Sequence, residues 1–456
     1  MTQLLFPPGF VWGAATAAFQ IEGSTTADGR TDSIWDAFCR RPGAIAGGDT
    51  GEPGADHFRR MHDDVGLMVE LGLNAYRFSV AWPRVRPDGG AVNPAGLAFY
   101  DRLVDALLAA GIDPWITLYH WDLPQALEER GGWANRDTAQ RFADYTEAVT
   151  GALGDRVRHW GTLNEPWCSA FMGYAQGTHA PGRTEPAAAV AATHHLLLAH
   201  GLGLRVIREL VPDAQAGLTL NLYPVRVADP TDPADLDAAR RIDGLQNRIF
   251  LDPLLRGAYP EDMLADLAPF GLPELIGADD AKLIGAPIDY LGFNYYRDYF
   301  VTARPDGTEP VHTPWVSAEH VRFPDRGLPR TACGWDVVPE GLTELLLRLH
   351  RDYPGMPLYI TECGAAYEDR IAADGSIADD ARITFLNSHL RAAHTALAAG
   401  VDLRGFFYWS LLDNFEWAEG YAKRFGIVHV DYETQVRTPK ASAQWYSRVI
   451  AEHAVP

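Results

Sequence analysis

Two glutamates stand at the ends of short extended segments, and each is followed by a residue that stops a strand. Glu165 lies in Thr162-Leu-Asn-Glu-Pro166, and Glu362 lies in Ile360-Thr-Glu-Cys-Gly364. An apolar, β-branched run that gives way to Pro or Gly is typical of a strand that ends in a loop. A carboxylate in such a run is costly unless the fold supplies partners for it. We therefore expect both carboxylates at strand tips.

Paired carboxylates on either side of one bond are the arrangement that glycoside hydrolysis requires. Either glutamate alone could equally be a surface carboxylate at the end of a strand. The two lie far apart in the sequence, so the fold must bring them together.

Extended apolar segments alternate with amphipathic, helix-like stretches along the whole chain. Asn93 and Pro94 predict the start of one helix, with Asn93 as its N-cap, and Gly111 predicts its end. Eight such alternations predict an α/β protein, a single (β/α)8 TIM barrel over residues 1–456, with long loops after the strands forming the cleft. The predicted strands are residues 11–20, 74–82, 114–121, 159–164, 216–223, 288–296, 357–362 and 405–411.

Residues 301–334 do not follow this alternation. They are rich in Pro, Gly and Arg and have little strand or helix periodicity. A long irregular segment in a compact domain is usually functional. We predict a loop after the sixth strand that forms one wall of the cleft.

Composition narrows the class of partner. The net charge of −21 argues against nucleic acid or an anionic membrane. No segment has the roughly 20 uninterrupted apolar residues of a membrane span, and the first residues lack a signal-peptide pattern. The four cysteines have neither metal-like spacing nor disulfide-rich density, so we expect free thiols and a cytoplasmic protein. Self-association is left open.

The side chains at the predicted strand tips suit a ligand rich in hydroxyl groups. Gln, Asn, His and Glu form directional hydrogen bonds, and Trp packs on the apolar faces of sugar rings. The tips carry no Lys for a Schiff base and no His and carboxylate cluster with metal spacing, so neither an aldolase nor a metal site is predicted. The tip residues are Gln20, Glu22, Arg77, His120, Trp121, Asn164, Glu165, Asn221, Asn294, Tyr296, Glu362, Trp409, Glu416 and Trp417.

These residues belong to longer motifs that resemble glycoside hydrolase family 1, of the β-glucosidase type. The resemblance covers nearly the whole chain. It rests on Phe6-Pro-Pro-Gly-Phe-Val-Trp-Gly-Ala-Ala-Thr-Ala-Ala-Phe-Gln-Ile-Glu-Gly23, Tyr76-Arg-Phe-Ser79, Leu118-Tyr-His-Trp-Asp-Leu-Pro124, Thr162-Leu-Asn-Glu-Pro-Trp167, Gly420-Tyr-Ala-Lys-Arg-Phe-Gly426 and Lys440-Ala-Ser-Ala-Gln-Trp-Tyr446.

The resemblance implies a retaining β-glucosidase that works in two displacement steps without a cofactor. Glu362 would be the nucleophile and Glu165 the general acid/base, with Arg77, Asn294 and Tyr296 supporting the nucleophile. Its substrates would be small β-D-glucosides or short β-linked oligosaccharides such as cellobiose, with β-D-galactosides and β-D-fucosides also open. The implied substrate-binding residues are Gln20, His120, Trp121, Asn164, Trp409, Glu416, Trp417 and Phe425, with Trp335 toward the leaving group.

Two alternatives within the same fold remain. A 6-phospho-β-glycosidase would need cations and hydroxyls near the last strand; Lys423 is compatible, but Glu416 would repel a phosphate and Phe425 offers no hydroxyl. An inactive sugar-binding relative, or a thioglucosidase, would typically lack one of the two glutamates, and both are present here.

Two residue types near the motifs need separate interpretation. Cys363 follows the nucleophile where the family usually has Asn, and we interpret it as a packed thiol rather than a reactive one. His179 is left open between packing and ligand contact. His194, His195 and His200 lie in an Ala- and Leu-rich stretch and are interpreted as packing residues.

Overall fold

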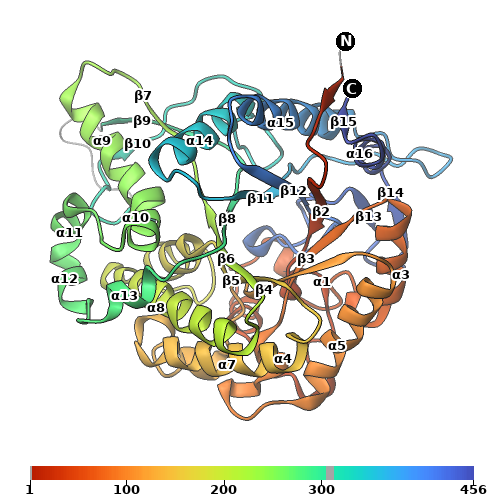
Figure 1. The fold of residues 1–456 in the computed structure, drawn as a ribbon, viewed down its shortest axis with the longest axis horizontal. Coiled ribbons are helices and arrows are strands. Elements are labelled where there is room, and N and C mark those ends of the chain that lie inside the picture. Colours follow the sequence, from red (N-terminus) through yellow and green to blue (C-terminus); the bar gives the residue numbers. More distant parts are fainter. Residues whose placement is uncertain (1–2, 304–312) are drawn as a thin grey trace.

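The computed structural model describes residues 3–303 and 313–456. Within this part of the chain, eight parallel strands close into a barrel, in the order β11-β12-β2-β3-β4-β5-β6-β8 (Figure 1). The predicted barrel is therefore confirmed. Its strands are β2 (Val11–Ala15), β3 (Ala75–Ser79), β4 (Asp113–Tyr119), β5 (His159–Asn164), β6 (Gln215–Asn221), β8 (Tyr290–Asn294), β11 (Leu358–Cys363) and β12 (Leu403–Trp409).

Helices surround the barrel and cover its strands (Figure 1). Long helices connect successive strands, as in α5 between β3 and β4 or α7 between β4 and β5. The α-helices are α1 (Ala18–Ile21), α2 (Ile34–Cys39), α3 (His57–Glu70), α4 (Trp82–Val85), α5 (Pro94–Ala109), α6 (Gln125–Glu128), α7 (Asp137–Leu153), α8 (Pro186–Leu210), α9 (Pro233–Asp243), α10 (Ile249–Arg256), α11 (Glu261–Leu267), α12 (Leu272–Leu275), α13 (Asp280–Ile284), α14 (Pro339–Asp352), α15 (Asp380–Ala398) and α16 (Ala441–Glu452).

The strand boundaries differ most at the ends of the first two strands; the second was predicted to run to residue 82, but β3 ends at Ser79. The first was predicted to run to residue 20, but β2 ends at Ala15 and α1 occupies the following residues. The predicted last strand is shifted by two residues relative to β12. Apolar composition misled the prediction because Ala18, Phe19 and Ile21 stay buried after the strand has ended.

The start of α5 corrects a second detail. Pro94 is the first helical residue, as predicted, and Gly111 has a positive φ of 74° just beyond the end. Asn93, however, does not cap the helix with its side chain. Its amide nitrogen donates instead to the backbone oxygens of Asp28 (2.7 Å) and Arg84 (2.9 Å), so this side chain ties a loop to the helix start.

The segment predicted as one irregular loop contains regular structure. β9 (Tyr299–Ala303) pairs with β7 (Val225–Val227) and with β10 (Val321–Arg322) in a small sheet outside the barrel. The prediction missed these short strands because the partner strand β7 lies in a distant part of the sequence, but residues of the segment do line the two cavities at the strand tips. Residues 304–312 of the predicted loop lie outside the described residues.

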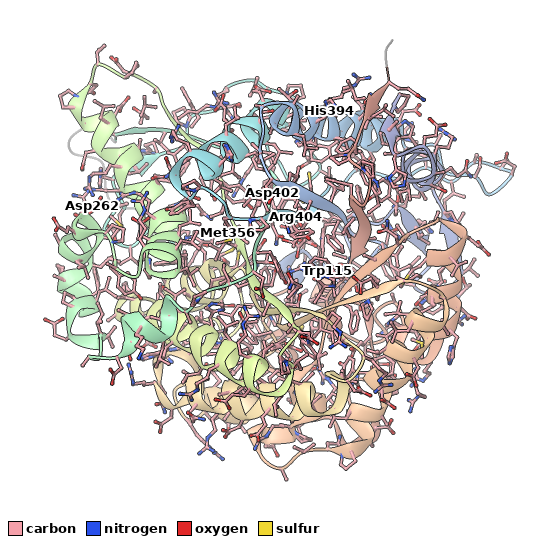
Figure 2. The ribbon with its side chains drawn as sticks, in the orientation of Figure 1. Trp115, Asp262, Met356, His394, Asp402 and Arg404 are labelled. Atoms are coloured by element: carbon pink, nitrogen blue, oxygen red, sulfur yellow. The ribbon has the colours of Figure 1, made fainter. Side chains whose placement is uncertain are left out.

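The core extends through the barrel to its amino-terminal end. The Trp115 ring, labelled in Figure 2, stacks on His159 at 4.0 Å and approaches Tyr359 and Phe407 at 4.8 and 5.1 Å between ring centroids. These side chains fill the barrel at the end opposite the strand tips. Ligand access is therefore confined to the tips, where the catalytic candidates lie.

Two further features concern the ends of the chain and its most apolar helix. β1 (Leu4–Leu5) pairs with β15 (Ala454–Val455), which brings the two ends together (Figure 1). α8 is long and apolar enough to cross a membrane by length and composition alone, but 94% of its most apolar window is buried inside the protein. The hydrophobicity of α8 is accounted for by its packing inside the protein.

The remaining strands, β13 (Val428–Val430) and β14 (Arg437–Pro439), form a separate antiparallel pair.

Candidate active site

Glu165 and Glu362 lie at the carboxyl-terminal ends of two barrel strands, as predicted. Glu165 directly follows β5 and is 5% exposed, and Glu362 is near the end of β11 and is 3% exposed. Glu165 has a positive φ of 44°, and its backbone N–H donates to the Thr219 carbonyl oxygen on β6 at 2.9 Å. Such a backbone conformation persists where surrounding structure fixes it, and functional sites are common places for it. The turn after β5 thus aims Glu165 into the barrel mouth.

Glu362 is held by two strong donors. Arg77 Nη1 donates to its Oε1 at 2.6 Å, and the Tyr296 hydroxyl donates to its Oε2 at 2.7 Å. Both contacts are buried, where charge-assisted hydrogen bonds are strongest. Burial raises the pKa of Glu362, while the positive charge of Arg77 and the Tyr296 hydrogen bond act against that rise. These two partners favour the ionised form of Glu362.

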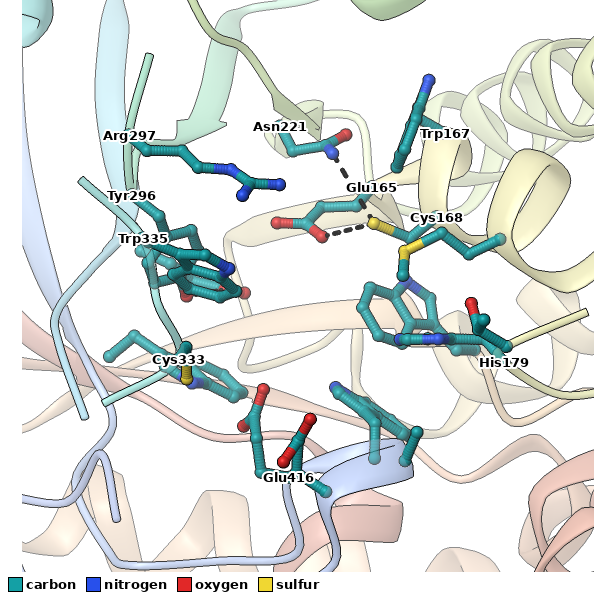
Figure 3. A pocket seen from close by; sticks show the side chains of 18 of the residues that line it. Glu165, Trp167, Cys168, His179, Asn221, Tyr296, Arg297, Cys333, Trp335 and Glu416 are labelled. Carbon is teal, nitrogen blue, oxygen red and sulfur yellow. Dashed lines mark hydrogen bonds between the residues drawn. The ribbon is translucent and has the colours of Figure 1, made fainter. Parts of the chain in front are cut away.

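Among the described residues, Glu165 has no cationic partner in direct contact. Its Oε1 accepts a hydrogen bond from Asn294 Nδ2 at 2.6 Å. Its Oε2 accepts one from the Cys168 thiol at 3.1 Å, which Figure 3 shows as a dashed line. Burial, and next the negative charge of Glu362, raise the pKa of Glu165 to about 8. Of the two carboxyls, Glu165 is therefore the one that holds a proton at neutral pH.

A buried polar network connects the two glutamates. Asn164 Oδ1 accepts from Arg77 Nη2 at 2.7 Å and from Asn294 Nδ2 at 3.1 Å. Asn294 was predicted to support the nucleophile, and a hydrogen bond from it does lower the pKa of Glu362. Its 2.6 Å contact, however, is with Glu165. The residue lies between both carboxyls because the tip of β8 lies between those of β6 and β11.

His120 is a neutral donor directed by the same network. Burial, and next the charge of Arg77, lower the pKa of His120 well below its usual value. Asn164 Nδ2 lies 3.1 Å from His120 Nε2; if the amide donates, Nε2 accepts and the proton is on Nδ1. His120 Nδ1 has no hydrogen-bond partner among the described residues. The ring thus has a donor left for a ligand.

The two glutamates open into a cavity with a volume of about 420 Å³. Ten of the predicted site residues line it, and the other four lie next to the lining residues. Arg77, Asn164 and Asn294 belong to the polar network, and Gln20 is hydrogen-bonded to Asn414 and Phe415. The ten lining residues are His120, Trp121, Glu165, Tyr296, Trp335, Glu362, Trp409, Glu416, Trp417 and Phe425.

Gln20 and Glu416 add polar atoms at the inner end of this cavity. The Gln20 amide nitrogen donates to Asn414 Oδ1 at 3.0 Å and to the Phe415 carbonyl oxygen at 2.8 Å. Gln20 Oε1 and Glu416 Oε2 are buried without a hydrogen-bond partner among the described residues. Burial, and next the charges of Glu362 and Glu165, raise the pKa of Glu416 to about 8. Near neutral pH its carboxyl is largely protonated, so the predicted charge repulsion of a phosphate by Glu416 is weaker than the sequence indicated.

Aromatic rings form the remaining walls. Trp417 packs on Trp121 with 4.5 Å between ring centroids, and the Trp121 indole N–H donates to the Asn164 carbonyl oxygen at 2.9 Å. Trp335 approaches Tyr296 at 5.3 Å and Phe425 at 6.1 Å on the other side (Figure 3). The cavity therefore combines hydrogen-bonding groups with flat apolar faces, which suits a carbohydrate ring.

Several lining residues were not predicted as site residues. Cys168 and Arg297 each lie within three positions of a predicted residue, and Asn221 was noted only as a strand tip. A search of the residues that directly follow each tip motif could have found the first two. The unpredicted lining residues include Trp167, Cys168, Met172, Asn221, Tyr223, Arg297, Tyr299 and Cys333.

The histidines outside the network divide into two groups. His179 lines the cavity, and burial lowers its pKa to about 4. His194, His195 and His200 pack within α8 and bond to Asp280, the Trp133 carbonyl oxygen and Thr162, as expected for packing residues. The Cys363 side chain is fully buried. In the described ranges, no group of three or more His, Cys, Asp or Glu side chains could hold a metal ion.

Known proteins resemble this chain over nearly its full length. A β-glucosidase B described as thermostable, from Thermobispora bispora, is 53% identical, with 99% of this chain and 92% of that protein covered. A bifunctional β-D-glucosidase/β-D-fucosidase from Bifidobacterium breve is 46% identical, with 99% of each chain covered.

Solved structures agree with the described fold. A psychrophilic β-glucosidase from Micrococcus antarcticus superposes with a TM-score of 0.96 at 55% identity, covering 99% of this chain and 100% of that one. A β-glucosidase from Thermotoga maritima in complex with deoxynojirimycin gives 0.94 at 45% identity and 99% coverage of both. The family model described as Glycosyl hydrolase family 1 matches residues 2–455. The chain belongs to glycosyl hydrolase family 1.

Proposed function

We propose that this protein is a retaining β-glucosidase with Glu362 as nucleophile and Glu165 as general acid/base. The observation that carries the assignment is the unequal surroundings of the two glutamates. Arg77 and Tyr296 contact Glu362, whereas Glu165 has no cationic contact within the described ranges and has a pKa raised to about 8. An ionised carboxylate beside a protonated carboxyl is the pair that double displacement requires.

The first step uses both groups together. Glu362 attacks the anomeric carbon while Glu165 gives its proton to the departing glycosidic oxygen, which forms a glycosyl-enzyme ester and frees the leaving group as an alcohol. The ester no longer carries the negative charge of Glu362, so the pKa of Glu165 falls. Glu165 then takes a proton from water, and the resulting attack on the anomeric carbon releases the sugar with its β-configuration retained.

The inner end of the cavity supports a glucosyl group as the cleaved unit. Gln20 Oε1, His120 Nδ1 and Glu416 Oε2 are buried polar atoms without partners in the described structure, and sugar hydroxyls would satisfy them. Trp409 and Trp417 offer apolar faces for the ring. Trp121 also lines this end, and Asn164 contacts Trp121 and His120 from behind the lining. Trp335 and Phe425 line the side from which the leaving group departs. Small β-glucosides and short β-linked oligosaccharides such as cellobiose fit this division.

Two finer proposals follow from the same site. Fucosides and galactosides differ from glucosides at one or two hydroxyls, and the relative from Bifidobacterium breve is named for both glucosidase and fucosidase activity. We include both as secondary substrates.

The acidic surface and the free thiols support a cytoplasmic protein that does not bind nucleic acid, and the paired chain ends support one domain over residues 1–456.

The test is a panel of aryl β-D-glucoside, β-D-galactoside, β-D-fucoside and β-D-glucoside 6-phosphate, compared by kcat/KM. We expect turnover of the neutral glycosides, with the glucoside or fucoside highest, and little turnover of the 6-phosphate. Preference for the 6-phosphate would replace the proposal with a phosphoglycosidase in which Lys423 contacts the phosphate. Absence of turnover for all four would favour an inactive sugar-binding protein.

A further inference from the structure

Arg297 is a cation in the active-site cavity that the proposed mechanism does not use. It follows Tyr296 in the loop between β8 and β9, and Figure 3 shows its side chain extending into the cavity. It is the only Lys or Arg among the described residues that line this cavity. His120 and His179, which also line it, are neutral because burial lowers their pKa values.

Arg297 forms no ion pair with any described carboxylate. Its Nη2 donates to the Tyr299 hydroxyl at 3.4 Å, a long hydrogen bond. The guanidinium carbon lies 5.0 Å from the Tyr299 ring centroid and 5.3 Å from that of Trp335. These two rings hold the guanidinium by cation–π contacts, and most of its N–H donors have no partner among the described residues.

Two neighbouring arginines differ from Arg297 because they are ion-paired with carboxylates. A second cavity of about 500 Å³ shares Trp167, Arg297 and Tyr299 with the first, and is also lined by Arg326 and Arg330. Arg326 is paired with Asp298 and Asp336, and Arg330 with Asp325 and Asp336. Their charges are neutralised within the protein. The charge of Arg297 is therefore the one left for a ligand among the described arginines of the two cavities.

The position of Arg297 identifies the part of the substrate that it would meet. The shared lining residues place it where the inner cavity passes into the outer one, beyond Glu165. The group that Glu165 protonates on departure would extend in that direction. Trp167 and Trp315 lie 4.9 Å apart between ring centroids on the wall of the outer cavity, so a flat aromatic group has a surface to pack on.

We propose that Arg297 selects β-glucosides whose aromatic leaving group carries a carboxylate, by forming a hydrogen-bonded ion pair with it. The planar guanidinium matches a carboxylate in two parallel N–H···O bonds, and the flanking rings hold it ready. This pairing offsets the repulsion that the ionised Glu362 and the net charge of −21 would exert on an anionic substrate. The inference rests on the proposed β-glucosidase function and names a substrate class for it.

The test compares para- and meta-carboxyphenyl β-D-glucosides with the matching carbamoylphenyl β-D-glucosides, which have the same shape without the charge. For each enzyme the quantity is the ratio of kcat/KM for the carboxylate to that for the carboxamide. In Arg297→Gln we expect this ratio to fall by about tenfold for at least one isomer, as for loss of a charge-assisted hydrogen bond. Arg297→Lys, which keeps the charge but not the planar fork, should give an intermediate ratio.

Arg330→Gln is the matched control, because it removes a cation from the outer cavity that is already ion-paired. Its ratio should equal that of the unaltered protein. Equal loss on both substrates in Arg297→Gln, or an unchanged ratio, would overturn the proposal and make Arg297 a structural residue of the loop.

Equilibrium binding keeps the inference separate from the proposed function. The 1-thio analogues of the same carboxylate and carboxamide are bound by calorimetry to the unaltered protein, Arg297→Gln and Arg330→Gln. We expect the dissociation constant of the carboxylate to rise about tenfold only in Arg297→Gln, which is the range for a charge-assisted contact. Failure to hydrolyse neutral phenyl β-D-glucoside would reject the proposed function, whereas loss of the charge preference alone would reject the role of Arg297.

Discussion

The inner end of the cavity, around Glu362, is lined by residues at the ends of barrel strands, whereas the outer end, around Arg297 and Trp335, is lined by loops. At the inner end, hydrogen bonds from Arg77 and Tyr296 hold the carboxylate at 2.6 and 2.7 Å. At the outer end, ring contacts near 5 Å and one long hydrogen bond hold Arg297. The inner end is therefore built for fixed geometry, as bond breaking requires, and the outer end for discrimination between leaving groups.

This difference predicts which kinetic constant each substitution changes. Inner substitutions should lower kcat and kcat/KM for every β-glucoside, because the lost interaction acts on the reacting atoms. Outer substitutions should change KM and depend on the leaving group. The proposed difference between the two ends would be wrong if an inner substitution changed only KM for certain leaving groups, or if an outer substitution lowered kcat for every β-glucoside.

Glu362→Gln should have the largest effect. Removing the nucleophile prevents formation of the glycosyl-enzyme, and loss of such a residue costs about 10⁴-fold or more in kcat. Initial rates on an aryl β-glucoside, with circular dichroism to check folding, measure it. The exposed Glu368→Gln, six residues further along the chain, is the control and should retain full activity. Substantial remaining turnover in Glu362→Gln would assign the nucleophile elsewhere.

Glu165→Gln should come next and should depend on the leaving group. General acid catalysis is worth about 10²–10⁴-fold, so the loss should be largest for methyl β-glucoside and smallest for an aryl glucoside with an acidic phenol. The unaltered enzyme needs Glu165 protonated, and its pKa is raised to about 8. Activity should therefore fall as pH rises through about 8, and this alkaline limb should disappear in Glu165→Gln. A limb that stays in the variant would mean that another group titrates there.

The inner end could be predicted from the sequence, and the outer end could not. Glu165, Glu362 and the residues around them lie in continuous motifs at strand tips, where the barrel fixes which side chains converge. Arg297 and Trp315 belong to a region whose pairing of β7 with β9 joins distant segments. Local composition there indicated only a loop, because long-range pairing leaves no mark in the residues themselves.

The charge states and hydrogen-bond partners of the site residues could not be predicted from the sequence either. Glu416 was predicted to repel a phosphate, but its carboxyl is surrounded by Glu165 and Glu362, which together with burial raise its pKa to about 8. Asn294 was predicted to act on the nucleophile, yet it is hydrogen-bonded to Glu165 at 2.6 Å. Both differences come from how the tips of β5, β8 and β11 and the loop after β12 are arranged around one cavity, which motif spacing does not give.

Tyr296→Phe should have an intermediate effect and should also shift the pH profile. A hydrogen bond to a buried charge is worth about 1.5–3 kcal/mol, or about 10- to 100-fold in kcat/KM. The Tyr296 hydroxyl lowers the pKa of Glu362. Its removal raises that pKa, and because the nucleophile must be ionised, the acidic limb should move to higher pH.

The control for this substitution is Tyr223→Phe. Tyr223 lines the same cavity but makes no hydrogen bond to Glu362 in the described structure, so the acidic limb should stay where it is. If the acidic limb of the pH profile did not shift in Tyr296→Phe, the Tyr296 hydroxyl would not be setting the pKa of Glu362 and would only be a packing contact.

Trp335→Ala should have the smallest effect and is the sharpest test of the outer end. Trp335 packs against Tyr296 and over the guanidinium of Arg297, beyond the reacting atoms. Loss of an aromatic contact of about 0.5–1.5 kcal/mol should raise KM for cellobiose or an aryl glucoside about 2- to 10-fold. Methyl β-glucoside, whose leaving group is too small to reach Trp335, should be hydrolysed with nearly unchanged kcat/KM. Trp335→Phe should restore most of the affinity for the larger substrates. If Trp335→Ala instead lowered kcat equally for methyl and aryl glucosides, the ring would be acting on Glu362 through Tyr296. The inner and outer ends of the cavity would then not act independently of each other.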